Sequence, residues 1–222
     1  MILRRGAIIL ISLILLCIVA LGLYGLKGYL DGLRDAPALA ARADRLIDRG
    51  QGAEALLGAE RLGWLITVQD PGFYDHNGVD MQTAGAGITT ITQSLSKREA
   101  FGQFQPGIGK LRQTTYALAL ERRLSKDQIL ALFLETVEMG PGPEGWMTGF
   151  GHASETVFGA APADLPDRDM MRLLAVMIAP GRFNLSEPGP QLNTRIDRIA
   201  RRLAGACVPQ DNRDVWLQGC AF

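Results

Sequence analysis

The stretch that decides the fold is residues 110–138, KLRQTTYALALERRLSKDQILALFLETVE. Within 111–123, leucine and alanine recur at the three- and four-residue spacing of one helix face. Ser125 follows, with Gln128 three residues later, which is the pattern of a capping box at the start of a helix. The stretch therefore predicts two consecutive helices, the second of which runs through Glu138 to a segment rich in glycine and proline.

Helical patterns continue on both sides of this stretch, whereas strand-like alternation is scarce. The helical patterns lie at 38–49, 53–68, 165–179 and 194–204. The segments that hold much of the glycine and proline lie at 70–88, 99–109 and 139–151. We therefore expect a mainly α protein in which these loops carry the functional site.

The N-terminal segment has the composition of a membrane anchor. Residues 7–26 carry no charge, and a helix of this length spans about 30 Å, the thickness of a hydrocarbon core. Two arginines precede the run and Lys27 follows it, which predicts a cytoplasmic N-terminus. We expect 1–27 to form a cytoplasmic tip and a single-pass transmembrane anchor, and 28–222 to form a domain outside the cytoplasm. A cleaved signal peptide is the alternative, but its apolar region is usually shorter and ends at a small-residue cleavage site.

The overall composition excludes several classes of protein. The 222 residues are 47% hydrophobic and 21% charged, which excludes a disordered chain. Lysine and arginine total 23, as do aspartate and glutamate, so there is no electrostatic basis for binding nucleic acid. No two of the three cysteines have the spacing of metal ligands. In an exported domain, Cys207 and Cys220 are expected to pair across a short polar loop, and two unpaired thiols are the alternative.

Three segments carry a more specific pattern. Residues 69–80, QDPGFYDHNGVD, are similar to E-D-x-x-F-x-x-H-x-G-x-D, and differ at the first fixed position. Residues 87–97, GITTITQSLSK, are similar to G-x-S-T-I-T-Q-Q-L-x-K. The third segment begins at Lys110 and includes LERRLSKDQIL at 120–130, which is similar to L-E-x-x-L-S-K-x-x-I-L. In this order, the segments resemble those of glycosyltransferase family 51, the peptidoglycan glycosyltransferases, and the resemblance is closest over 64–188.

The resemblance implies a bilobed, lysozyme-like domain in the periplasm, anchored in the bacterial inner membrane. It implies inverting glycosyl transfer on lipid II, an undecaprenyl-diphosphate-linked precursor, with the membrane and proteins of cell-envelope synthesis as further partners. The acceptor hydroxyl needs a base within reach, and the leaving diphosphate needs cations or N–H donors. In the family, the base is the glutamate that opens the first segment, and a second glutamate assists near the diphosphate.

This sequence departs from the family at both acidic positions. Gln69 occupies the position of the base, and counting back from Ser125 places the second glutamate at Gln113. Glutamine has the shape of glutamate but accepts no proton, and the loss of a positioned base costs about 10² to 10⁴ in rate. Gln69 and Gln113 are therefore the candidate catalytic positions. The candidate substrate-binding residues are Asp70, Phe73, His76, Thr89, Thr90, Thr92, Gln93, Lys97 and Lys110.

These replacements predict a pocket that binds the glycan-lipid without catalysing glycosyl transfer, so the protein would have a binding or scaffold role. The alternative is an active inverting transferase that polymerises lipid-linked glycan with a relocated acid. The candidate acids are Asp70, Asp75, Glu135 and Glu138, the last two on one face of one predicted helix. No cofactor and no metal site are predicted, although the family's divalent ion at the diphosphate is an alternative. The simpler interpretation of His76 is a hydrogen-bonded structural role. The simpler interpretation of Lys97 and Lys110 is that they are solvated surface charges.

Overall fold

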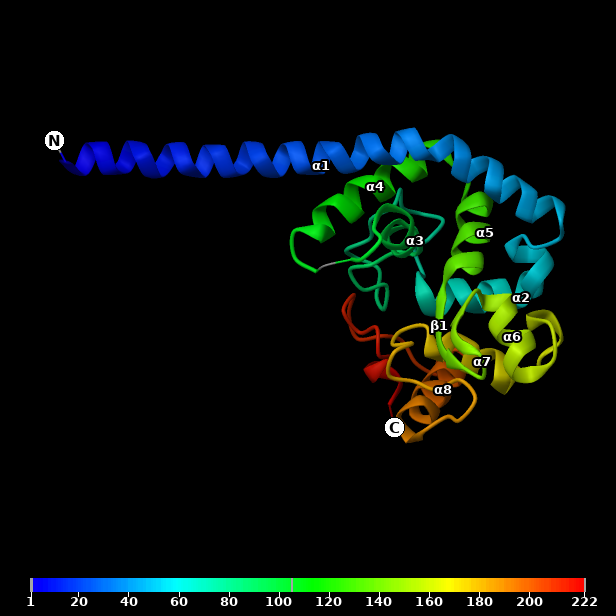
Figure 1. Cartoon of the computed structure of the whole chain (residues 1–222). Coiled ribbons are helices and arrows are strands. Elements are labelled where there is room, and N and C mark those ends of the chain that lie inside the picture. The colour runs from blue at the N-terminus through cyan, green and yellow to red at the C-terminus, as the bar shows by residue number, and fades with distance from the viewer. Residues whose placement is uncertain (1, 105, 222) are drawn as a thin grey trace.

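The computed structural model describes residues 2–104 and 106–221 and confirms a mainly α protein (Figure 1). The long helices are α1 (Ile2–Asp48), α2 (Ala53–Gln69), α3 (Ile91–Ala100), α4 (Gly109–Arg123), α5 (Lys126–Thr136), α6 (Phe150–Phe158), α7 (Asp167–Val176) and α8 (Pro190–Leu203). Two short 3-10 turns, η1 (Pro162–Asp164) and η2 (Gln218–Cys220), and two strands, β1 (Glu138–Gly142) and β2 (Gly145–Thr148), complete the described elements.

Helix α1 joins the predicted anchor to the domain without interruption. It has 47 residues, passes through the expected boundary at 27–28, and includes the helix predicted at 38–49. Its apolar window has a mean hydropathy of 3.0 and no buried part, so this helix is long and apolar enough to cross a membrane. Figure 1 shows this part of α1 extending beyond the rest of the molecule. The helix bends in its last third, where Pro37 removes a backbone donor.

The base of the anchor packs closely against α4. A Cβ atom added to Gly28 would lie 2.5 Å from the Thr115 hydroxyl oxygen. A Cβ atom added to Gly32 would lie 2.8 Å from the Cβ of Ala119. Real Cβ atoms do not approach so closely, so the absence of side chains at these two positions sets the distance between the helices.

Polar contacts fix the same pair of helices. Asp31 is buried on α1 and accepts hydrogen bonds from Lys27, at 2.8 Å, and from Arg112 on α4, at 3.0 Å. The buried Tyr116 hydroxyl of α4 donates to Asp35 at 3.0 Å. The part of α1 that follows the apolar run is therefore built into the core of the domain.

Helix α5 lies at the centre of a bilobed arrangement. Its residues 129–134 are all buried, and α1, α2, α3 and α6 all contact it. In Figure 1, α1, α3 and α4 form one group of helices and α6, α7 and α8 form the other. The capping box predicted at Ser125 and Gln128 is confirmed, with both reciprocal hydrogen bonds present.

A hairpin replaces the predicted end of α5. The helix ends at Thr136, and Glu138 opens β1, which pairs antiparallel with β2 in a segment predicted to be a loop. The prediction that Glu135 and Glu138 share one helix face is therefore wrong. The helix ends two residues earlier than predicted because Val137 is extended and its backbone oxygen accepts from the N–H of Gly149 at 2.8 Å, a residue beyond β2.

The C-terminal loop is closed by a disulfide. Cys207 and Cys220 are bonded, with their Cα atoms 5.2 Å apart, as predicted. Inside the closed loop, the buried Asp214 carboxylate accepts backbone hydrogen bonds from Gln210 at 3.0 Å and Gly219 at 2.8 Å. These bonds hold the pKa of Asp214 below its ordinary value although burial opposes them. The cross-link and the capped turn give the C-terminal segment a defined shape.

Candidate functional site

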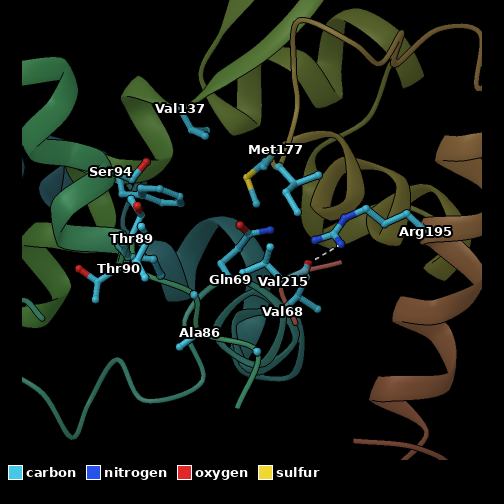
Figure 2. Close-up of a pocket in the computed structure, with 16 residues that line it drawn as sticks. Val68, Gln69, Ala86, Thr89, Thr90, Ser94, Val137, Met177, Arg195 and Val215 are labelled. Atoms are coloured by element: carbon cyan, nitrogen blue, oxygen red, sulfur yellow. Dashed lines mark hydrogen bonds between the residues drawn. The ribbon is translucent and has the colours of Figure 1, made fainter. Parts of the chain in front are cut away.

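A cavity of about 370 Å³ lies where the two lobes meet. Its walls come from the C-terminal ends of α2, α5 and α7, from the loop before α3, from α8, and from the C-terminal segment (Figure 2). Figure 2 shows Gln69, at the end of α2, projecting into the middle of this space. The polar side chains of its lining belong to Gln69, Thr89, Thr90, Ser94 and Arg195.

The amide of Gln69 is used as a hydrogen-bond donor. Its Nε2 donates to the backbone oxygen of Leu174 at 3.0 Å. Leu174 lies in the last turn of α7, where carbonyl oxygens lack partners within the helix. Gln69 therefore connects α2 to α7 through a contact that an ionised glutamate could not make, because a carboxylate only accepts.

Gln113 lies outside the cavity. It is 2% exposed on α4, and its Nε2 donates to the backbone oxygen of Gln93 on α3 at 2.6 Å. The Gln93 side chain is also buried and completes the capping box at the start of α3, where its Oε1 accepts from the N–H of Thr90. The structure does not bring the two predicted catalytic positions together in the cavity.

Asp70 and His76 form a buried pair that shapes the loop after α2. The Asp70 side chain is fully buried and accepts from the N–H of Ile91 at 2.9 Å. His76 Nε2 lies 3.0 Å from Asp70, and Nδ1 accepts from the N–H of Gly78 at 3.0 Å. Because Nδ1 accepts, the ring proton lies on Nε2 and is donated to Asp70. This geometry gives both residues a structural role.

Phe73 and Thr92 also face the interior. The Phe73 ring is fully buried beneath the Lys126 ammonium, whose Nζ lies 4.3 Å from the ring centroid. Lys126 pairs with Glu121 at 2.8 Å, and the buried Thr92 hydroxyl donates to the same carboxylate.

Of the predicted substrate-binding residues, Thr89 and Thr90 line the cavity and Lys97 and Lys110 are cations with accessible ammonium groups. The other five, Asp70, Phe73, His76, Thr92 and Gln93, hold the loop against α3, α4 and α5.

Lys110 lies beside Thr89 at the edge of the cavity, and Lys97 lies on α3, outside the lining. Lys110 donates to the Thr89 hydroxyl at 2.8 Å, and burial lowers the pKa of Lys110 to about 8. Lys97 is exposed on α3, with its Nζ 5.4 Å from the Phe104 ring centroid. Within residues 2–104 and 106–221, neither ammonium forms an ion pair with a carboxylate. Both remain available to an anionic ligand.

The candidate relocated acids lie elsewhere. Glu135 pairs with Arg42 at 2.7 Å and lines a different hollow, beside α6. Asp75 lines a hollow beside the loop after α2, and Glu138 is exposed on β1. In the part of the chain that the structure describes, no aspartate, glutamate or histidine lines the cavity. The geometry therefore gives no support to a relocated acid.

Arg195 is a lining residue that the sequence analysis did not identify. It is 3% exposed, lies on α8, and donates through Nη1 to the backbone oxygen of Val215 at 2.8 Å. The sequence contains a signal for it, since Arg195 falls on the same helix face as Leu192, Ile196 and Ile199, all of which are buried. Because arginine is rarely fully buried unless it is paired, a charged residue within this apolar face stands out in the sequence.

The C-terminal loop supplies one wall of the cavity. The N–H groups of Gly85 and Gly87 donate to the backbone oxygens of Asp211 and Asn212, at 2.9 and 2.7 Å. Gly87 has a φ of +70°, and a Cβ there would lie 2.5 Å from a methyl carbon of Val215. The loop that carries Thr89 is thus positioned by a segment more than 120 residues away, which no local pattern indicates.

Comparison with known proteins agrees with this architecture. The pattern of the transglycosylase family matches residues 60–204, so the chain belongs to that family. It is 30% identical over 151 residues to a biosynthetic peptidoglycan transglycosylase of Shewanella amazonensis, covering 63% of this chain and 60% of that protein. A protein of the same name from Azoarcus is 28% identical over 65% of this chain and 66% of its own length.

A further relative places the domain within a much longer protein. Penicillin-binding protein 1B of Vibrio cholerae is 27% identical over 150 residues, which are 62% of this chain and 19% of that protein. The chain matches about three fifths of the length of the Shewanella relative. The shared part therefore corresponds to the transglycosylase region, and the family resemblance seen in the three sequence segments is confirmed.

Proposed function

We propose that the protein is a membrane-anchored member of the transglycosylase family that binds lipid-linked peptidoglycan precursor of the lipid II type without transferring the sugar. The observation that carries this proposal is the lining of the cavity. Gln69 occupies the position of the family's base, and no other described residue of the lining accepts a proton near neutral pH. A sugar hydroxyl left without a base loses about 10² to 10⁴ in rate.

The remaining groups favour binding. Lys110 offers positive charge beside Thr89, where a diphosphate would be held by charge-assisted hydrogen bonds. The amide oxygen of Gln69 and the hydroxyl of Ser94 line the cavity and suit the hydroxyl groups of a sugar. Such a site retains recognition of the anionic precursor and of its glycan without the proton transfer that turnover requires.

The family's divalent ion does not fit this site. Magnesium and similar hard cations prefer carboxylate oxygens, and the described part of the lining contains none. We therefore propose that side-chain cations alone balance the diphosphate charge.

The anchor and the disulfide support an extracytoplasmic domain. The apolar face of α1 is exposed from Ile8 to Leu23, and positive charges precede it in the sequence. The bond between Cys207 and Cys220 is typical of an oxidising compartment. We propose that the N-terminus is cytoplasmic and that the domain lies in the periplasm, beside other proteins of cell-envelope synthesis.

The full-length protein in detergent should bind fluorescent lipid II saturably and form no glycan strands. Lys110→Met should weaken that binding about tenfold, because one charge-assisted contact is lost. Arg49→Met, at an exposed position outside the cavity lining, serves as the charge-matched control. Glycan strands made by the native protein would overturn the proposal, as would the absence of lipid II binding. Strands that persist in Gln69→Ala would indicate the relocated acid instead.

A double variant separates a missing base from a missing pocket. Gln69→Glu combined with Gln113→Glu restores both family acids, and polymerisation by this variant alone would show that the pocket is intact. The folded fraction must be measured in the same preparation, because both glutamines donate hydrogen bonds to backbone oxygens.

A further inference from the structure

We propose that Arg195 forms an oxyanion subsite on the α8 wall of the cavity and that this subsite takes a phosphate group, diphosphate in particular. The inference rests on the proposed binding function and deepens it. It adds a cationic contact on the wall opposite Thr89, contributed by a helix that none of the three sequence segments contains.

The first argument is that Arg195 is a buried charge without a counter-ion. Its side chain forms no ion pair in the described parts 2–104 and 106–221. Nη1 donates to the Val215 oxygen, and Nε is enclosed by the protein without a hydrogen-bond partner, so Nη2 is the nitrogen left for a ligand. Buried charges in proteins are normally paired or hydrogen-bonded throughout, because removing them from water is unfavourable. A guanidinium with donors to spare at a cavity wall is therefore suited to an external anion.

The second argument is the charge of the surroundings. Arg198, on the same helix, adds positive charge, and burial together with Arg198 lowers the pKa of Arg195 to about 10. The guanidinium therefore stays charged near neutral pH. Asp214 is the nearby acid, but its carboxylate is already satisfied by the backbone N–H groups of the disulfide loop. The Trp216 ring, 5.6 Å away, covers another side of the guanidinium.

The third argument is the shape of the site. In Figure 2 the Arg195 guanidinium points from α8 toward Gln69 and Val215, with Thr89 and Ser94 on the far side. Ser94 Oγ accepts from Arg98 at 2.8 Å, which leaves its own proton for a ligand. The planar guanidinium matches phosphate oxygens in pairs, and a cavity of about 370 Å³ holds a diphosphate with room for a neighbouring sugar.

Titration of the full-length protein with inorganic diphosphate, followed calorimetrically in detergent, tests the proposal. The native protein should bind one diphosphate saturably, and Arg195→Gln should weaken binding tenfold or more. Arg182→Gln is the matched control, because Arg182 also lies over the Trp216 ring, at 6.0 Å, but is exposed and outside the cavity. Its affinity should stay within twofold of the native value.

A second variant keeps the test decisive if Arg195→Gln does not fold. Met177→Trp fills the cavity without changing any charge, and should abolish diphosphate binding. Saturable binding that survives Met177→Trp or a folded Arg195→Gln would overturn the subsite, as would the absence of saturable binding by the native protein. Undecaprenyl diphosphate, titrated in parallel, identifies the source of the phosphate: tighter binding indicates the lipid, and equal binding indicates free diphosphate.

The two proposals fail in different ways. If lipid II binds but diphosphate affinity does not depend on Arg195, the subsite is wrong and the binding function stands. If diphosphate binds through Arg195 while lipid II does not bind, the subsite stands and the proposed function is wrong.

Discussion

Replacing Gln69 by glutamate tests what holds the central side chain of the cavity. The amide donates to the Leu174 oxygen at 3.0 Å. An ionised carboxylate has no proton to donate and would face that oxygen with negative charge. Losing the hydrogen bond and leaving the carbonyl without a partner costs about 1–3 kcal/mol. A protonated carboxyl would keep the bond, so this contact raises the pKa of the introduced group above its ordinary value of about 4.3.

The raised pKa sets the sign of the pH dependence. Below about pH 4.3 the group is protonated in both the folded and the unfolded state, so the Gln69→Glu variant should match the native protein. As the pH rises, the unfolded state releases its proton first, and stability is lost up to the folded-state pKa. We expect the free energy of unfolding to fall below the native value by about 1–3 kcal/mol at pH 8.

Chemical denaturation of the full-length protein in detergent, at several pH values, measures this difference. Gln69→Met removes the hydrogen bond without adding charge, so its cost of about 1 kcal/mol should not change with pH. A Gln69→Glu variant that equals the native protein at pH 8 would refute the assigned hydrogen bond. A deficit that shrinks as the pH rises would refute the reasoning about the proton.

Three further predictions concern the lysine, the disulfide and the anchor. Burial lowers the pKa of Lys110 to about 8, so the diphosphate affinity of the native protein should fall above that pH while the affinity of Lys110→Met should not show this fall. Titrations from pH 7 to pH 9.5 measure both affinities, and parallel curves for the two proteins would contradict the prediction. Replacing Cys207 and Cys220 together by serine should lower the free energy of unfolding by about 3 kcal/mol, and a reductant should lower that of the native protein equally. Gly28→Leu should destabilise the packing of α1 against α4 by about 1–3 kcal/mol in thermal unfolding, whereas Gly22→Leu, with no atom within 4 Å of its added Cβ, should be neutral.

Local signals were sufficient for much of the fold. The capping box at Ser125, the apolar run of α1 and the helical periods of α2, α4, α7 and α8 all depend on residues close in sequence. The start of α3 carries the same capping signal at Thr90 and Gln93, so this helix was also within reach of sequence reasoning. The hairpin was not, because β1 acquires its partner only when the chain turns between Gly142 and Gly145 and β2 returns beside it.

The candidate site was less accessible from sequence. Gln69 was identified because the family pattern marks its position, and the structure does place it in the cavity. The contribution of α8 and of the disulfide loop depends on contacts between segments far apart, such as the Asn212 amide donating to the Thr83 oxygen at 3.0 Å. Buried residues such as Asp70 and Phe73 match the family pattern equally well, and only the packing shows that they shape the loop rather than line the cavity.

The two glutamines have more in common than their departure from the family. Each amide donates to a backbone oxygen, Gln69 to Leu174 and Gln113 to Gln93. An ionised acid at either position would repel that oxygen and leave it without a donor, so we expect each restored acid to destabilise the fold. Where the family has two acids, this chain has two amides that donate hydrogen bonds. One of these bonds joins α2 to α7 and the other joins α4 to α3. The contacts that hold these helices together are therefore the same contacts that place an amide where the family has an acid, which supports the proposed binding role.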